Sequence, residues 1–403
     1  MSVAVTVPGA AVAATTPPDV WSSDAAGGGH TYANTGETAI SSTSAAKLKA
    51  AWKTTNGSSF VAPAVVGGVA YHAINPGNAN DQSTVVASSV RTGARLWSVS
   101  LPESEYYRGQ SVSGGVAVLP FEGWHRLGGV TAVDLSTHKV LWSRSRPAST
   151  IDPGNDDGTG GPVAVDSGNA YLLAGNNDLT AYNLKTGALL WHLDPSAGVK
   201  AIAAGGGRLY TGGYPSGGGP GLVAYNGSTG KKEWTAPGLY GQPAVDGSVV
   251  LAPTYQGVGS VAAAGCAAST CKLTWSESFG AQPDSIVIGA ATPTTFFVAF
   301  EPTSSDTGRL KRISTTTGTV QWTYRTPQPL GQVPIRAGNT VWVLTDIHTV
   351  KGWSVSTTAS AALKTITLPS ADDGVVGGIA DAGGSLLVDI FAGDLTAYRI
   401  PGS

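Results

Sequence analysis

A tryptophan recurs along most of this chain at a nearly constant interval. The intervals are 45, 45, 49, 43, 41 and 47 residues, and the positions are Trp52, Trp97, Trp142, Trp191, Trp234, Trp275 and Trp322. A period in the forties with no helical pattern inside it is typical of the four-stranded blades of a β-propeller. This repeat constrains the fold more than any other feature of the sequence.

The segment 161–194 shows the internal pattern of one repeat unit. It contains four short stretches, GPVAVDSG, NAYLLAG, DLTAYNLKTG and ALLWHLD, in which apolar and polar residues alternate with a period of two. Glycine or Thr-Gly stands between stretches where a tight hairpin needs positive φ. Each unit therefore predicts a four-stranded antiparallel sheet, and we expect the tryptophan of its last strand to pack against the next blade.

Seven complete units and one incomplete unit align along the chain. The incomplete unit, 373–400, supplies three strands, whereas 48–54 carries Trp52 without three strands before it. Strand 48–54 is therefore predicted to complete the last blade and to close the ring, so that no sheet edge is left open there. The predicted fold is an all-β, eight-bladed β-propeller that occupies 19–403 as one domain.

Composition and the N-terminal residues narrow the possible environments. The chain has 55 glycines, 12% charged residues and a net charge of −2, so it has many tight turns and no basic patch for nucleic acid. No apolar run approaches the roughly 18 residues that span a membrane. Residues 1–18, with VAVTVPGAAVAA at 3–14, are read as a signal-peptide remnant or a flexible tail. We therefore expect a secreted or extracytoplasmic protein.

The phrase x-x-Thr-Gly-x-x-x-Trp resembles the repeat of the pyrroloquinoline-quinone-like (PQQ-like) β-propellers, which are eight-bladed. It ends at Trp97, Trp191, Trp234 and Trp322, and the lead-in from Trp21 to Trp52 is also similar to the start of such proteins. The resemblance implies the fold over nearly the whole chain and says little about function. Quinone-dependent dehydrogenases of that superfamily bind their cofactor with adjacent cysteines, a stacking tryptophan and calcium. This chain has no adjacent cysteines, so we expect no cofactor and no metal.

The two cysteines, Cys266 and Cys271, lie in GCAASTCKLTW and replace the Thr-Gly turn of the fifth blade. A cysteine pair across a hairpin predicts a disulfide, which would indicate an oxidising compartment. A metal-binding pair and a redox motif are the alternatives. The four intervening residues and the absence of a histidine nearby in the sequence disfavour both.

The longer loops of the repeat indicate where a ligand would bind. Turns between the first and second strands and between the third and fourth share one face of a propeller, and here they are short. The other face, called here the long-loop face, carries the second-to-third and inter-blade loops. Its candidate ligand-binding residues are Tyr106, Tyr107, Arg108, Gln110, Trp124, Tyr240, Gln242, Tyr255, Asp284, Gln332 and Phe391.

Two groups of these candidates have alternative interpretations. The aromatic side chains, among them Tyr106, Tyr107, Trp124 and Phe391, would stack on a sugar ring or another flat, hydroxylated ligand, or they simply pack within the loops. The glutamines Gln110, Gln242 and Gln332 would surround the central channel, or their amides would cap strands by hydrogen bonds.

Two pairs of histidine and carboxylate are the candidates for acid–base catalysis: Glu122 with His125, and Asp346 with His348. Neighbours within a loop also pair by chance, and no hydrolase, zinc-protease or dinucleotide motif accompanies them. Two function classes therefore remain open. One is a cofactor-free propeller that binds a small or saccharide-like ligand or a protein partner on the long-loop face. The other is a cofactor-independent lyase, hydrolase or cyclase with a pocket at the channel mouth.

Overall fold

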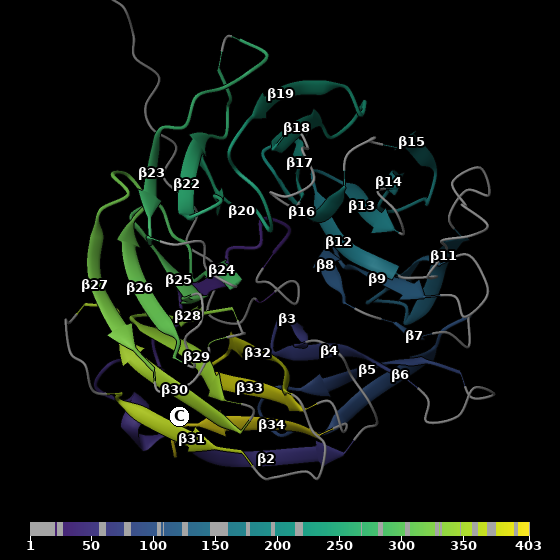
Figure 1. Ribbon diagram of the computed structural model, residues 1–403. Coiled ribbons are helices and arrows are strands. Elements are labelled where there is room, and N and C mark those ends of the chain that lie inside the picture. Colours follow the sequence, from purple (N-terminus) through teal and green to yellow (C-terminus); the bar gives the residue numbers. More distant parts are fainter. Residues whose placement is uncertain are drawn as a thin grey trace, which may run out of the picture.

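The computed structural model describes residues 21, 27–55, 62–75, 82–102, 106–107, 109–122, 128–145, 160–174, 178–194, 198–213, 221–266, 268–280, 285–302, 307–326, 330, 333–346, 348–356, 362–368, 376–390 and 394–402. Within these residues, eight antiparallel sheets stand around a common centre (Figure 1). The prediction of an all-β, eight-bladed propeller is confirmed. The one helix of the described residues is a short 3-10 turn, Ala45–Lys47.

Each of the first four blades begins at the centre of the ring and ends at its rim. Blade 1 consists of β3 (Ala64–Val66), β4 (Val69–Ile74), β5 (Thr84–Ser89) and β6 (Arg95–Ser100). Blade 2 consists of β7 (Tyr106–Tyr107), β8 (Ser111–Ser113), β9 (Val116–Glu122), β10 (Gly129–Asp134) and β11 (Lys139–Ser145). Blade 3 consists of β12 (Gly160–Asp166), β13 (Asn169–Ala174), β14 (Asp178–Asn183) and β15 (Leu189–Leu193). Blade 4 consists of β16 (Val199–Gly205), β17 (Arg208–Gly213), β18 (Leu222–Asn226) and β19 (Lys232–Ala236).

The other four blades complete the ring in chain order. Blade 5 consists of β20 (Ala244–Asp246), β21 (Val249–Pro253), β22 (Gly257–Ala262) and β23 (Trp275–Ser278). Blade 6 consists of β24 (Ser285–Gly289), β25 (Thr295–Glu301), β26 (Arg309–Ser314) and β27 (Val320–Arg325). Blade 7 consists of β28 (Ile335–Ala337), β29 (Thr340–Asp346), β30 (Thr349–Ser354) and β31 (Lys364–Thr367). Blade 8 consists of β32 (Val376–Ala382), β33 (Ser385–Ile390), β34 (Asp394–Arg399) and β2 (Lys49–Thr55).

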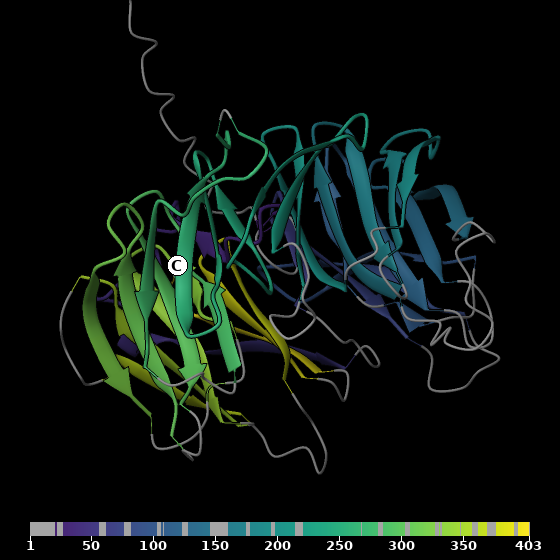
Figure 2. The ribbon, with the colours of Figure 1, turned by 45° about the horizontal axis from the view of Figure 1, so that its top comes forward.

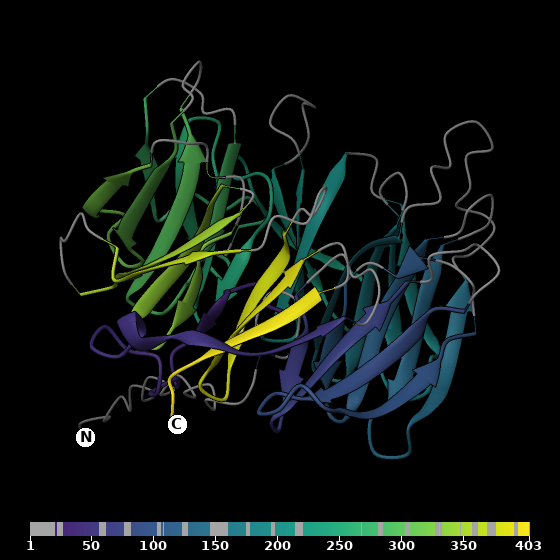
Figure 3. The same cartoon turned by 90° about the horizontal axis from the view of Figure 1, so that it is seen from below.

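The N-terminal strand closes the ring. Strand β2 lies beside β34 in both Figure 1 and Figure 3, and the two pair antiparallel from Lys49 opposite Arg399 to Thr55 opposite Asp394. The ammonium group of Lys53 lies 2.6 Å from a carboxylate oxygen of Asp394. The prediction that this strand completes the last blade is therefore confirmed.

The recurrent tryptophan joins the blade that carries it to the next blade of the ring. The indole Nε1 of Trp142 donates a hydrogen bond to the carbonyl oxygen of Leu184 in blade 3, 3.0 Å away. The same ring packs on the turn glycine of that blade, because a Cβ placed on Gly187 would lie 2.5 Å from it. In blade 2 the turn carries His138 instead of glycine. His138 has a φ of 57° and stacks on Trp97 at 4.5 Å.

A segment before the first blade, Trp21 and 27–34, runs along the innermost strands and is called here the lead-in segment. It appears in purple at the centre of Figure 1. Trp21 pairs antiparallel with Val65 of β3, and β1 (Ala33–Asn34) pairs parallel with β28. Between these points the carbonyl oxygen of Gly28 accepts from the N–H of Ala204, and that of Gly29 accepts from Val245.

These contacts place the lead-in segment on the face opposite the long-loop face. Val165, Ala204 and Val245 lie at the ends of the innermost strands, next to the short first turn of their blades. A Cβ on Gly28 would lie 2.2 Å from the carbonyl oxygen of Val165, so this passage accepts only glycine at that position. The lead-in segment therefore crosses the short-turn end of the channel, and the sequence pattern did not predict it.

The cysteines form the predicted disulfide, with Cα atoms 5.6 Å apart. The bridged segment lies against the rim of blade 4, because Cys271 donates its N–H to the carbonyl oxygen of Thr235 and Thr235 donates to Ser269. A disulfide indicates an oxidising compartment. Among the described residues, no helix has the length and apolarity to cross a membrane.

Candidate functional site

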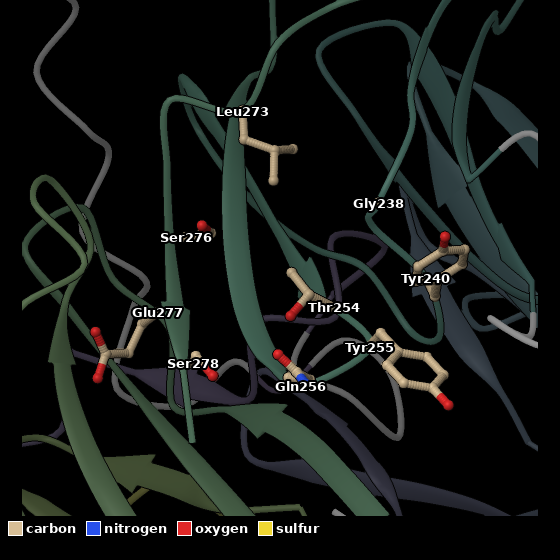
Figure 4. A pocket seen from close by; sticks show the side chains of 9 residues that line it. All are labelled: Gly238, Tyr240, Thr254, Tyr255, Gln256, Leu273, Ser276, Glu277 and Ser278. Atoms are coloured by element: carbon tan, nitrogen blue, oxygen red, sulfur yellow. The ribbon is translucent and has the colours of Figure 1, made fainter. Parts of the chain in front are cut away.

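A cavity of about 500 Å³ opens on the long-loop face beside blade 5 (Figure 4). Tyr240 and Tyr255 lie on one side of it, and β23 borders the other side. The residues that line it are Gly238, Tyr240, Thr254, Tyr255, Gln256, Leu273, Ser276, Glu277 and Ser278. A volume between about 300 and 1,000 Å³ is usual for a small-molecule site.

The two tyrosines lie in two different loops. Tyr240 lies between β19 and β20, where its N–H donates to the carbonyl oxygen of Pro253 at 2.7 Å. Tyr255 lies in the turn 254–256 between β21 and β22, which is closed by a 2.8 Å bond from the N–H of Thr254 to the carbonyl oxygen of Gly257. About half of the Tyr255 side chain is exposed, although it lies in a turn with well-defined backbone bonds. Two backbone bonds therefore hold an open aromatic surface in place.

The remaining lining is mostly uncharged and able to form hydrogen bonds. Thr254, Ser276 and Ser278 supply hydroxyl groups, and Gln256 supplies an amide. Among the lining residues that the structure describes, Glu277 carries the one carboxylate. The nearby ammonium of Lys311 lies over the rings of Phe279 (4.1 Å) and Phe300 (5.4 Å). Burial lowers the pKa of Lys311 and the charge of Glu277 raises it again, so the two charges interact across the blade boundary.

Of the candidate ligand-binding residues, the structure brings Tyr240 and Tyr255 together in this cavity. It places Tyr107 in the core between blades 1 and 2, where its hydroxyl lies 3.1 Å from that of Thr131 and its side chain is buried. Thr254, Ser276 and Ser278 also line the cavity, but the sequence did not predict them. Isolated serines and threonines form no motif with a recognisable spacing.

The side chains of two of the glutamines, Gln110 and Gln242, donate hydrogen bonds to backbone carbonyl oxygens towards the preceding blade. The Nε2 of Gln110, before blade 2, donates to the carbonyl oxygen of Ala62 before blade 1, at 2.8 Å. The Nε2 of Gln242, before blade 5, donates to Ile202 of β16 in blade 4, also at 2.8 Å. This geometry matches the strand-capping alternative, and it leaves Gln110 buried.

Several candidates lie outside the residues that the structure describes. These are Arg108, Trp124, His125, Asp284, Gln332 and Phe391. For Tyr106 and Glu122 only the backbone is described, in β7 and β9, where the two residues face each other across the sheet. Their roles in binding or catalysis stay predictions.

The structure joins the second acid–base pair through the backbone, and it brings another pair together. The N–H of His348 donates to a carboxylate oxygen of Asp346 at 2.8 Å, which forms a local turn. In blade 3, by contrast, the Nε2 of His192 lies 2.7 Å from the carboxylate of Asp178. Thr180, which faces His192 across β14 and β15, donates its hydroxyl to the same oxygen. No sequence pattern indicates this pair, because fourteen positions and a hairpin separate its members.

The site of a quinone-dependent dehydrogenase does not fit this chain. The adjacent cysteines of that site have no counterpart here, because Cys266 and Cys271 are five positions apart, bonded to each other and placed at the rim of blade 4. Among the residues that the structure describes, no three His, Cys, Asp or Glu side chains are close enough to hold a metal ion.

Solved structures with the same fold span widely different proteins. The quinohemoprotein alcohol dehydrogenase from Comamonas testosteroni is 14% identical, with a TM-score of 0.69, 98% of this chain covered and 82% of the dehydrogenase. The computationally designed Ika8 protein is 12% identical, with a TM-score of 0.66 and coverages of 87% and 98%. BamB from Moraxella catarrhalis is 14% identical, with a TM-score of 0.61 and coverages of 87% and 99%. Likeness at such identities shows the fold alone.

Sequence comparison assigns the family. No curated protein matches the chain in sequence. A family model described as Outer membrane protein assembly factor BamB, PQQ_2, matches residues 10–177, 126–268 and 175–294. Because these matches together span 10–294, more than half of its length, the chain belongs to this family of PQQ-like repeat propellers.

Proposed function

We propose that this protein is a secreted or extracytoplasmic binding propeller that works without a cofactor and takes a small, saccharide-like ligand in the cavity of blade 5. The family and the fold support a binding or scaffold role in general. The disulfide supports the location, because such bonds persist in oxidising compartments.

One observation carries the choice of ligand: Tyr240 and Tyr255 share a cavity whose other lining groups are mainly hydroxyls and an amide. The face of a sugar ring is apolar and stacks on tyrosine, whereas its edge exchanges hydrogen bonds with groups such as those of Thr254, Gln256 and Ser276. A strongly charged ligand would find a single charged group, Glu277, in the described lining.

The same lining favours binding over catalysis. Acid–base chemistry on a glycosidic bond uses two carboxyl groups, and general-base catalysis commonly uses a histidine. In the described lining Glu277 is the one carboxylate, and no histidine accompanies it. The enzyme alternative therefore rests on Asp346 with His348, which do not line this cavity, and on Glu122 with His125, whose side chains the structure does not describe.

The test is binding of mono- and oligosaccharides to the intact protein, measured by calorimetry and by tyrosine and tryptophan fluorescence. Tyr255→Ala should weaken binding about tenfold or more, since stacking and burial on one aromatic contribute over a kilocalorie. The matched control is Thr323→Ala, an exposed residue on the outermost strand of blade 6. If Tyr255→Ala binds the saccharide as tightly as the parent does, this cavity is not the binding site. Turnover of a bound sugar would favour the enzyme class.

The family description also names an assembly factor, which makes a protein partner the second candidate. A partner that covers the long-loop face would compete with the saccharide for Tyr255. A partner bound elsewhere would not, so competition between the two distinguishes them.

A further inference from the structure

The outermost strand of most blades contains the same irregularity just before its tryptophan. In blade 1, Trp97 pairs with Ala87 and Arg95 pairs with Ser88, so Leu96 has no partner opposite it. Blades 2 and 3 repeat this β-bulge, which leaves Leu141 and Leu190 unpaired in the same way. A bulge adds one residue to one strand of a pair and turns it out of the ladder.

These bulged leucines are exposed to solvent. Five large hydrophobic side chains are exposed among the described residues, and four of them lie on the outermost strands of blades 1 to 3: Leu96 (53%), Leu141 (40%), Leu189 (54%) and Leu190 (40%). Single exposed leucines are ordinary on a protein surface. Here, however, the same position repeats on three consecutive blades, drawn blue to teal at one side of Figures 1 and 2.

The other blades show that the fold does not need leucine at this position. The equivalent bulged residue is Glu233 in blade 4, Gln321 in blade 6 and Ala51 in blade 8. Glu233 has a use within its own blade, because its carboxylate binds Arg208 and Asn226. The bulge thus tolerates charged, polar and small side chains, and the leucines of blades 1 to 3 require a different explanation.

The molecule itself shows how the rim of a blade can be extended. Residues 269–271 add to the outer edge of β19, where Thr270 pairs parallel with Thr235 and two backbone bonds of 2.9 and 2.7 Å hold them. In the described part of the chain, β6, β11 and β15 are the last strands of their sheets. Each therefore offers a row of backbone donors and acceptors beside exposed leucine.

Strands β6 and β11 carry permanent charges of one sign, Arg95, Lys139 and Arg144, all exposed, although Lys139 faces Asp134 of β10 across the sheet. Strand β15 carries no permanent charge, and none of the three strands contains aspartate or glutamate. A segment that pairs with such an edge gains by carrying carboxylates next to apolar side chains.

We propose that the rims of blades 1 to 3 bind an extended segment of a partner protein, rich in aliphatic and acidic residues, which adds to the edge of β6, β11 or β15 and packs on the bulged leucine. This surface lies apart from the blade 5 cavity, so it does not depend on the saccharide ligand.

The probe is a displayed library of random peptides, selected on the intact protein. The discriminating variant is Leu96→Gln/Leu141→Gln/Leu190→Gln, which should fold because blade 6 already carries Gln321 at the equivalent position. Enriched peptides should alternate aliphatic with acidic residues and should bind the triple variant about tenfold or more weakly. The control Gln321→Ala should bind as the parent does, and the three single variants locate the rim that is used.

Three results would overturn the proposal. The first is a set of peptides that bind the parent and the triple variant equally. The second is a failure to enrich any peptide on a correctly folded protein. The third is self-association of the parent, seen by light scattering and abolished in the triple variant, which would make a second copy of this chain the occupant. Unchanged saccharide binding by the triple variant keeps this test separate from that of the cavity.

Discussion

The indole Nε1 of Trp52 donates a hydrogen bond to the carbonyl oxygen of Val90, 2.9 Å away in blade 1. The same ring packs on Gly93 of the turn between β5 and β6, where an added Cβ would lie 2.6 Å from it. Strand β2 therefore has two roles: it pairs with β34 to complete blade 8, and its tryptophan fixes that blade to the first.

Replacing this indole should separate its polar and apolar contributions. Trp52→Phe removes the donor to Val90 and keeps most of the ring, so the free energy of unfolding in urea should fall by about 1 kcal/mol. Trp52→Ala also removes the packing on Gly93 and should cost about 3 kcal/mol or more. Equal losses for the two variants would show that the hydrogen bond, and not the packing, holds the blades together.

The glycines of the lead-in segment should be intolerant of any side chain. A Cβ at position 28 meets the carbonyl oxygen of Val165 at 2.2 Å, and one at position 29 meets that of Val245 at 2.5 Å. Gly28→Ala should therefore lower the free energy of unfolding by about 1–3 kcal/mol and speed proteolysis before residue 33, because the segment must leave its backbone bonds. Gly198→Ala is the control, since nothing lies within 4 Å of its added Cβ. Equal stability of the two variants would contradict the described path.

Local patterning explains why the blades could be predicted from the sequence. Alternating residues, tight-turn glycines and a periodic tryptophan each act within a few positions, so they determine the four-stranded units, and Trp52 without preceding strands predicts the ring closure. The Cys266–Cys271 bond follows from its place in a hairpin. Each of these signals can be read from residue types at fixed positions within or between short stretches of the sequence.

The lead-in segment and the cavity lacked such a signal. Gly28 and Gly29 are held by backbone bonds to Ala204 and Val245, which are remote in the sequence, and backbone bonds leave no side-chain pattern. The cavity combines an inter-blade connection, a short turn and one strand, so Tyr240 and Tyr255 were recognised individually but their shared site was not. The repeat pattern also predicted long second-to-third loops, whereas in blade 5 only 254–256 connect β21 to β22.

Two buried histidines should make the protein sensitive to acid. Burial lowers the pKa of His30 and of His72 from 6.5 to about 4, and neither nitrogen of His72 has a hydrogen-bond partner among the residues that the structure describes. The unfolded chain binds these protons more readily, so stability is complete above about pH 6.5 and falls as the pH drops towards 4. Urea unfolding across this range should show a loss of about 1.4 kcal/mol per pH unit for each histidine. His72→Leu should flatten the curve, and an unchanged slope would contradict the buried, neutral state.

The buried carboxyl of Asp381 should have the opposite dependence. Burial raises its pKa well above 3.8, the charge of Glu37 raises it further, and the amide of Asn34, which donates to the Asp381 carbonyl oxygen at 3.2 Å, opposes this rise. Because the folded state holds this proton more tightly, stability is complete below the unfolded pKa near 4 and declines as the pH rises. Asp381→Asn should therefore raise the free energy of unfolding at pH 7 by about 1–3 kcal/mol and change it little at pH 4.

Asp134 is the comparison for the unfolding measurements on Asp381→Asn, because its pKa is shifted in the opposite direction. Hydrogen bonds from Ser136 and Thr137 lower the pKa of Asp134 to about 2, so its stabilisation is present at pH 7 and disappears in acid. Asp134→Asn should thus lose stability at pH 7, where Asp381→Asn gains it. A gain in both variants would point to net charge instead of burial.

Reduction of the disulfide should loosen the rim of blade 4 more than the ring. The bond closes a loop of only six residues, so its loss should cost about 2 kcal/mol by chain entropy. The direct effect should fall on the amides of Cys271 and Thr235, which bond across the edge of β19. Hydrogen exchange with and without reductant should show faster exchange at these two amides and unchanged exchange at Leu135 and Leu184, whose amides bond within blades 2 and 3. Uniform acceleration through all blades would mean instead that the whole ring depends on this clamp.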